Sequence, residues 1–305
     1  MIKRTLYFGN PAYLSMRDAQ LVIHLPEANG IDDKTGNNTI PIEDIGVVIL
    51  DHKQITITHG LMEALLANNC AMITCDSSRM PVGLQLPLSG NTIQSERFQT
   101  QLEASQPLLK QLWQQTIQAK ITNQAYVLHT KRNVVVKNML AWVNDVKSGD
   151  TDNLEARAAA YYWGSLFPKL PDFRRGREGI PPNNLLNYGY AILRAVVARS
   201  LVASGLLPTF GIHHHNRYNA YCLADDIMEP YRPFVDKLVI EIMDGGEDIS
   251  ELTKSIKAKL LTVPVLDVII NHQRSPLMIA VGFTTASLAK CYAGEARKIT
   301  YPDFV

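Results

Sequence analysis

The sequence lacks several features that define large classes of protein. Its 305 residues contain no run of about 18 consecutive apolar residues, the length that a membrane-spanning helix requires. Only four residues are cysteines, and these lie too far apart for a zinc motif or a dense set of disulfides. The polar pair Gly9-Asn10 interrupts the N-terminal segment before the apolar core of a signal peptide could form. We therefore expect a globular protein of a reducing cytoplasm.

An excess of charge of one sign is also absent. The 30 basic and 29 acidic side chains leave a formal net charge of +1, which excludes a histone-like polycation. A nucleic-acid enzyme with its basic residues on one face stays possible. The net charge is −3 over residues 1–94 and +4 over residues 95–305. The second part of the chain is therefore the better candidate for contact with an anion.

The hydrophobic pattern changes near residue 90. Before it, short apolar runs at Leu21–Ile23, Val47–Leu50 and Ala71–Thr74 alternate with turn residues, which predicts strands around one helix at residues 58–69. After it, apolar residues recur at helical spacing. Helices are predicted at 153–166, 184–204, 218–243, 247–261 and 276–293. The expected fold is α+β, with a small β-rich domain at residues 1–90 and a larger all-helical domain at residues 91–305.

Familiar catalytic motifs are missing: there is no Walker loop, no GxGxxG after a strand, no HExxH and no GxSxG. The helical part instead carries ligands suited to a hard metal ion. Asp225 and Asp226 are each spaced to share a helix face with Glu229. Like charges this close disfavour ionisation of both, unless a cation or an arginine neutralises them. A solvated acidic face with Arg232 as a local partner is one interpretation, and a metal site, favoured by the apolar neighbours, is the other.

Three histidines, His213, His214 and His215, precede these acids. Adjacent side chains cannot all face one centre, so at most one or two of them ligate the same ion. Imidazole combined with carboxylates suits Mn²⁺ or Mg²⁺ better than structural Zn²⁺.

Glu155 is a further candidate ligand with a structural alternative. Asp152-x-x-Glu155 has the spacing of a capping box, in which the acid satisfies backbone N–H groups. Yet Ala158 and Tyr162 fall on the same helix face, so the carboxylate faces an apolar surface. Burying an unpaired polar group costs roughly 2–7 kcal/mol, and a metal ion would remove that cost. From the residues alone, the cap and the ligand are equally favoured.

Arg174, Arg175 and Arg177 lie in a loop rich in Pro and Gly. Such clusters are usually solvated. Three arginines beside candidate metal ligands are, however, a common way to hold a phosphate backbone.

Four segments of the helical part form a specific combination: Asn153–Trp163, Asn183–Tyr190, Gly211–His214 and Asn219–Pro233. In this order they resemble the CRISPR-associated endonuclease/integrase, the first Cas protein family, which is the catalytic subunit of the spacer-acquisition complex. The resemblance covers nearly the full length. The segment Met-Glu-Pro-Tyr-Arg-Pro at 228–233 is similar to the corresponding segment of the family branch that accompanies type II systems, which implies a bacterial protein.

The resemblance implies a Mg²⁺ or Mn²⁺ ion held by Glu155, His214 and Glu229. His214 is chosen because the family's histidine follows a glycine by three residues, here Gly211. Many members have Asp where this chain has Glu229. Asp226 matches a further acidic position near the metal, where it would support a ligand rather than bind the ion itself. The resemblance thus favours ligand over cap for Glu155.

The activity implied is endonuclease and integrase chemistry, in which the 3′-OH of an incoming DNA fragment attacks the edge of a CRISPR repeat. Such transesterification needs no nucleotide cofactor, in agreement with the missing Walker loop. The implied partners are double-stranded DNA, a second copy of the chain through the β domain, and the small ferredoxin-like second Cas protein in a heterohexamer, with no membrane. Arg174, Arg175 and Arg177 would position DNA. A general nuclease for branched DNA in repair and a non-catalytic DNA-binding scaffold are the alternatives.

Overall fold

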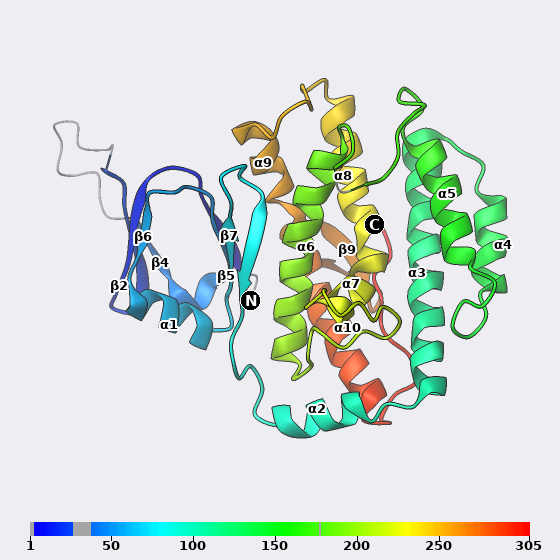
Figure 1. Cartoon of the computed structure of the whole chain (residues 1–305), viewed down its shortest axis with the longest axis horizontal. Coiled ribbons are helices and arrows are strands. Elements are labelled where there is room, and N and C mark those ends of the chain that lie inside the picture. The colour runs from blue at the N-terminus through cyan, green and yellow to red at the C-terminus, as the bar shows by residue number, and fades with distance from the viewer. Residues whose placement is uncertain (1–2, 27–37, 177) are drawn as a thin grey trace. The chain divides into compact units, whose positions relative to one another are not determined.

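The structure is a computed structural model that describes residues 3–26, 38–176 and 178–305 (Figure 1). The chain divides into two compact units, Met1–Thr92 and Ile93–Val305. Strands dominate the first unit and helices the second, which confirms the predicted α+β class. Within the described ranges, no helix combines the length and the apolar character that a membrane crossing demands.

The first unit contains two four-stranded sheets. One has the order β1 (Arg4–Phe8), β5 (Ile45–Leu50), β7 (Ala71–Cys75) and β8 (Pro81–Gln85), with only β8 antiparallel to its neighbour. The other has the order β4 (Asn38–Pro41), β3 (Gln20–His24), β2 (Ala12–Arg17) and β6 (Ile55–Ile57). The three strands expected from short apolar runs are therefore confirmed as β3, β5 and β7.

The burial of β5 follows from its place in the sheet. It pairs with parallel strands on both sides, so residues 45–49 are all buried and its sequence is continuously apolar rather than alternating. The predicted helix is α1 (His59–Ala67), whose Leu61 and Leu65 join a core with residues of both sheets. It ends before Asn69, which adopts a positive φ of 56°.

The second unit is built on three long helices: α3 (Gln106–Arg132), α6 (Asn183–Ala203) and α10 (Leu277–Tyr292). Shorter helices surround them: α2 (Gln94–Leu102), α4 (Lys137–Asp145), α5 (Leu154–Leu166), α7 (Cys222–Met228), α8 (Arg232–Asp244) and α9 (Lys254–Leu260). The predicted helices at 153–166, 184–204 and 276–293 thus correspond to α5, α6 and α10. Helix α9 is much shorter than the predicted 247–261.

The helix predicted at residues 218–243 is interrupted in the structure. It consists of α7, a 3-10 turn η3 (Glu229–Tyr231) and α8. Pro230 and Pro233 have no backbone N–H to donate, and each lies in the first turn of the element that follows the break. The backbone of Glu229 nevertheless stays α-helical, with φ −52° and ψ −48°.

The described residues of the second unit are mostly helical, but not entirely so, as the expected all-helical domain at residues 91–305 would be. Strands β9 (Asp267–Ile270) and β10 (Gln273–Pro276) form an antiparallel hairpin. The two turn residues, Asn271 and His272, both have positive φ, which is the backbone of a type I′ turn. A further 3-10 turn, η4 (Val263–Val265), precedes the hairpin.

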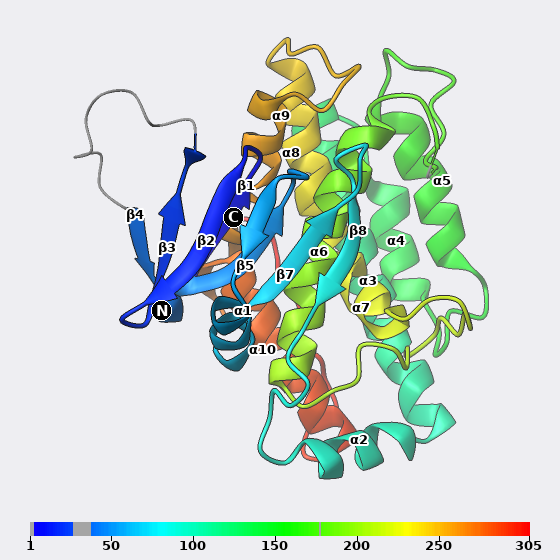
Figure 2. The same ribbon diagram turned by 60° about the vertical axis from the view of Figure 1, so that its left-hand side comes forward.

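Helix α3 brings the candidate residues together. Its buried face carries the apolar residues Leu112, Trp113, Ile117 and Ile121 and also the polar residues Lys120 and Asn123. It packs against both α5 and η3, and Figures 1 and 2 show α5 alongside α3 from two directions. Glu155 on α5 and Glu229 on η3 therefore approach the same side of α3.

Candidate functional site

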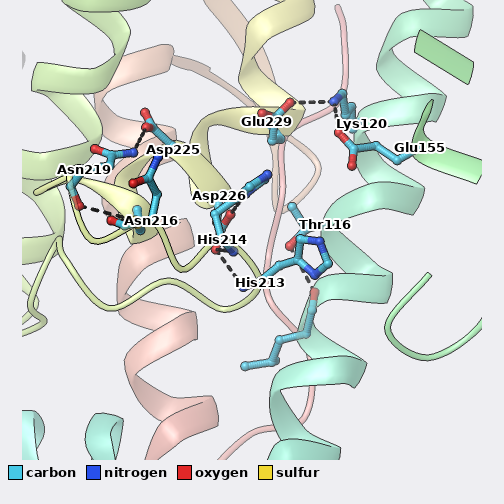
Figure 3. A network of polar contacts seen from close by, with 12 residues as sticks. Thr116, Lys120, Glu155, His213, His214, Asn216, Asn219, Asp225, Asp226 and Glu229 are labelled. Carbon is cyan, nitrogen blue, oxygen red and sulfur yellow. Dashed lines mark hydrogen bonds and ion pairs between the residues drawn. The ribbon is translucent and has the colours of Figure 1, made fainter. Parts of the chain in front are cut away.

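Asp226 on α7 organises the loop that carries the histidines. Its side chain is fully buried and accepts the backbone N–H groups of His213, at 2.9 Å, and His214, at 3.4 Å. It also hydrogen-bonds Nδ1 of the His214 ring (Figure 3). Because a carboxylate only accepts, Nδ1 carries the proton and Nε2 is the ring nitrogen left for another partner. The hydrogen bond to Asp226 raises the pKa of His214.

Two of the three histidines lie against Trp113. The ring of His213 stacks on Trp113, with centroids 4.3 Å apart and planes 3° apart, and burial lowers its pKa. The ring of His214 meets the same tryptophan edge-on, at 5.5 Å, and stands at 88° to that of His213. His215 is exposed. That at most one or two of the three ligate the same ion stays a prediction.

Gly211 is required where the chain passes close to itself. A Cβ at this position would lie 2.4 Å from the carbonyl oxygen of His214 and 2.7 Å from Oδ2 of Asp226. Neither atom is at the end of a flexible side chain that can turn aside, since Asp226 is held by the loop's own N–H groups. The glycine that the sequence placed three residues before His214 thus keeps the histidine against Asp226.

Gly211→Ala is expected to destabilise the protein by about 1–3 kcal/mol, because the added methyl group overpacks a closed contact. It should also return the pKa of His214 towards its ordinary value as the hydrogen bond to Asp226 is lost. Urea denaturation and NMR titration of the histidine measure the two effects. Gly164→Ala on α5 is the matched control: its Cβ would meet open space, so it should stabilise by about 0.4–1 kcal/mol. Equal effects of the two substitutions would contradict the close approach.

Glu155 and Glu229 meet at one ammonium group, that of Lys120. Nζ of Lys120 lies 2.6 Å from Oε1 of Glu155 and 2.7 Å from Oε2 of Glu229 (Figure 3). The first contact is a hydrogen bond, whereas Oε2 of Glu229 accepts no well-aligned hydrogen bond from any described residue and is held by charge. The side chains of Lys120 and Glu229 are 9% and 8% exposed, so little water screens the pair.

The pKa shifts in this group show that opposite charges outweigh burial. Burial lowers the pKa of Lys120, but Glu229 and Glu155 more than compensate, and its pKa is raised. Burial raises the pKa of Glu229, but Arg232 and Lys120 outweigh it, and its pKa is lowered. Arg232 contacts Oε1 of Glu229 at 3.1 Å. Lys120, Glu229 and Arg232 are therefore all charged at neutral pH.

The capping-box interpretation of Glu155 is wrong. The first N–H groups of α5, those of Leu154 and Glu155, are accepted by the two carboxylate oxygens of Asp150, each at 2.9 Å. Asp152 instead forms a surface ion pair with Lys147. Because Asp150 caps the helix, the side chain of Glu155 is available for Lys120.

The interpretation of the acids as a solvated face is wrong in one part and right in the other. Asp226 and Glu229 are buried rather than solvated, but Arg232 is a local partner of Glu229, as expected. Asp225 forms two bonds to Arg194, at 2.7 and 3.0 Å, and accepts a hydrogen bond from Asn219. The spacing in sequence suggested that Asp225 and Glu229 act together, but the structure separates their roles.

The loop arginines differ from one another. Arg174 is exposed. Arg175 donates to Gly176 and Asn183 and stacks over Tyr190, so its guanidinium is committed within its own unit. Arg177 lies outside the described residues. Of the two arginines that the structure describes in this loop, Arg174 is the one whose exposure suits a phosphate.

The donor set fits a hard divalent ion, although a rearrangement is needed. Within the described ranges, no three His, Cys, Asp or Glu side chains form a ready-made metal cluster. Two carboxylates nevertheless already surround one cation, the Lys120 ammonium, and one oxygen of Glu229 is held without a directional bond. The nearby imidazole, whose pKa responds to both glutamates, is oriented by a carboxylate as metal-binding histidines usually are.

Lys120 was missed by the sequence reasoning. Its signal is present, since it is spaced to lie on the apolar face of its helix between Ile117 and Ile121, where a lysine is rarely buried without a partner. Trp113, which stacks with His213, could not be recognised as part of the site from the sequence, because a tryptophan on the apolar face of a helix is usually a core residue.

Comparison with known proteins identifies the family. The family model described as CRISPR associated protein Cas1 matches residues 6–262. The CRISPR-associated endonuclease Cas1 of Neisseria meningitidis serogroup C (strain 8013) is 37% identical over 307 aligned residues, which span 100% of this chain and 97% of that protein. The chain therefore belongs to the Cas1 family. The predicted type II-like branch is compatible with this relative.

Solved structures share the fold. A casposase bound to integration product has a TM-score of 0.76 at 20% identity and covers 98% of this chain and 92% of its own. A chain of a Cas6-RT-Cas1–Cas2 complex has a TM-score of 0.71 at 19% identity, covering 97% of this chain and 35% of that one. At these identities the likeness concerns the fold.

Proposed function

We propose that this protein is an integrase and endonuclease of CRISPR adaptation that joins the 3′-OH of a DNA fragment to the edge of a repeat with the help of a divalent metal ion. The observation that carries the proposal is the convergence of Glu155 and Glu229 on one cation position, with His214 close enough for both glutamates to raise the pKa of its ring. Family membership supports it, as do a relative named an endonuclease and a casposase of the same fold bound to integration product.

Each residue of the site has a distinct task in this proposal. Glu155, Glu229 and Nε2 of His214 hold Mg²⁺ or Mn²⁺, which suits oxygen and imidazole ligands. The ion supplies Lewis-acid stabilisation of the charge that develops on the phosphodiester oxygens. Asp226 keeps the imidazole in the tautomer that can ligate. Arg232 helps to keep Glu229 ionised, because its guanidinium is the largest of the positive charges that lower the pKa of that carboxyl against the effect of burial.

The partners belong to the same proposal. Double-stranded DNA is the substrate, and the small second Cas protein is the bridging partner, since a chain of the same fold occurs in a Cas6-RT-Cas1–Cas2 complex. The first unit mediates self-association: it carries none of the candidate ligands Glu155, His214 and Glu229, and Tyr13 of β2 is 52% exposed. A small sheet with an exposed aromatic side chain opposite its buried face is well suited to pairing with a second copy.

The test is an integration assay on supercoiled plasmid that bears the repeat, with a DNA fragment, Mg²⁺ or Mn²⁺, and the second Cas protein present or omitted. The expected result is fragment joined at the repeat edge only when the metal is present. Cleavage of branched DNA without any preference for the repeat would instead indicate a repair nuclease. DNA binding without strand joining would indicate a scaffold. Light scattering on the same sample measures the molar mass of the protein. A strict monomer at tens of micromolar would contradict self-association.

Arg174→Ala is expected to weaken binding to all DNA sequences alike. Removing one phosphate contact should lower the slope of log affinity against log salt by about 0.7–0.9. Binding measured by fluorescence anisotropy over a range of salt gives this slope. Arg274→Ala is the control, because Arg274 is exposed like Arg174 but is paired with Asp267 on the β9–β10 hairpin. A slope unchanged in Arg174→Ala would place Arg174 among ordinary solvated residues.

A further inference from the structure

Lys120 holds three separate elements at one point. The ammonium on α3 contacts a carboxylate of α5 and a carboxylate of η3, although Glu155 and Glu229 are distant from it in the sequence. The side chain is 9% exposed, so it is not a surface lysine that happens to lie near an acid. A buried ammonium is stable only when carboxylates compensate the loss of water, and these two do so.

We propose that Lys120 is an internal competitor for the divalent ion: its ammonium occupies the cation position between Glu155 and Glu229 and must leave it before both carboxylates can ligate. This inference rests on the proposed function, since it presumes that these carboxylates are metal ligands. It adds a residue that none of the sequence motifs contains, and it makes metal affinity depend on α3.

An ion that binds the two oxygens now held by Lys120 must displace the ammonium. Carboxylate oxygens bind Mg²⁺ at about 2.0–2.1 Å, whereas the same oxygens already have Nζ of Lys120 at 2.6 and 2.7 Å. One space between two carboxylates cannot hold both cations at such distances. The four-carbon stem of lysine carries its charge on rotatable bonds, so the ammonium can withdraw while α3 stays in place.

Charge acts in the same direction. A unit positive charge this close to a divalent ion opposes its binding, and the low exposure of the site keeps the repulsion from being screened. In the absence of metal, the same ammonium compensates the negative charges of the buried Glu229 and the partly exposed Glu155, which would otherwise repel each other. Lys120 therefore stabilises the metal-free protein and lowers its affinity for the ion.

The test measures Mn²⁺ binding to the full-length protein by isothermal titration calorimetry, without DNA. Lys120→Met is expected to bind Mn²⁺ more tightly than wild type, by at least about tenfold, because the opposing charge is gone. Lys131→Met is the matched control. Lys131 lies on the same helix and pairs with a single carboxylate, that of Glu241 at 2.7 Å, so its loss should leave the affinity unchanged. An affinity of Lys120→Met that is equal to or weaker than wild type overturns the inference.

A second variant and a second readout guard against loss of fold. Lys120→Gln removes the charge but keeps one N–H donor for Glu155, and it should also bind Mn²⁺ more tightly. In thermal denaturation both variants should melt lower than wild type without metal and gain more from added Mn²⁺, because ligand binding stabilises by mass action. If Mn²⁺ raises the melting temperature of both variants by no more than it raises that of wild type, this result also counts against the inference.

Glu155→Gln separates this inference from the proposed function. If wild type binds Mn²⁺, Glu155→Gln loses that binding and Lys120→Met binds no tighter, then only the role of Lys120 fails. If neither wild type nor Lys120→Met binds Mn²⁺, the metal site itself fails, and the proposed function with it.

Discussion

Glu155→Gln and Glu229→Gln will each reduce strand transfer by about 10³ or more, while DNA binding stays close to wild type. Glutamine keeps the length of the side chain but removes the negative charge, and a neutral amide is a poor ligand for a hard cation whose charge must stabilise the reacting phosphodiester. Single-turnover joining of a labelled fragment measures the rate, and anisotropy measures binding. His214→Ala should have an effect of the same size.

Asp152→Asn is the matched control for these substitutions. Asp152 lies three residues before Glu155, but it pairs with Lys147 at the surface, so the loss of its charge should leave strand transfer unchanged. Normal integration by Glu155→Gln would remove the carboxylate pair from the mechanism. A similar loss in Asp152→Asn would mean that charge near the start of α5, rather than a ligand, is responsible.

Asp226→Asn is expected to weaken metal binding by about 10–100-fold and to reduce strand transfer accordingly. The amide oxygen can still accept the backbone N–H groups of His213 and His214, but the amide nitrogen then faces Nδ1 of the ring. Because both would be donors, the imidazole must move its proton to Nε2, the nitrogen proposed to bind the ion. The chain should fold normally, with NMR of the His214 ring reporting the changed tautomer.

Two further variants define what Asp226 contributes. Asp225→Asn is the control, because the neighbouring acid bonds Arg194 and Asn219 and should affect metal affinity little. Asp226→Ala removes the acceptor altogether and should cost about 3 kcal/mol of stability, since a buried carboxylate with several partners is lost. Metal affinity unchanged in Asp226→Asn, as measured by calorimetry, would show that His214 needs no orientation from Asp226.

The local hydrophobic pattern predicted most of the helices and strands correctly. It failed for those elements whose bounds depend on packing with distant residues or on the residues of a turn. Leu61 and Leu65 are spaced for one helix face and are buried on α1, as predicted. The hairpin of β9 and β10 was missed, because its four-residue strands are too short for a period to be visible and its turn, Asn-His, lacks the usual glycine. Proline determines the break at Glu229 locally, but the length of the helix after it depends on packing.

The sequence by itself determined which residue types are available and in which local frame: an α+β chain, a glycine before His214, and acids at 225, 226 and 229. Only the tertiary structure decided their partners. Asp150 rather than Glu155 caps α5, Asp225 pairs with Arg194, and Arg175 is held over Tyr190. Lys120 reaches Glu155 and Glu229 because α3, α5 and η3 pack together. Partner choice between such distant residues depends on which buried charges must compensate one another once water is excluded, and no local spacing encodes that.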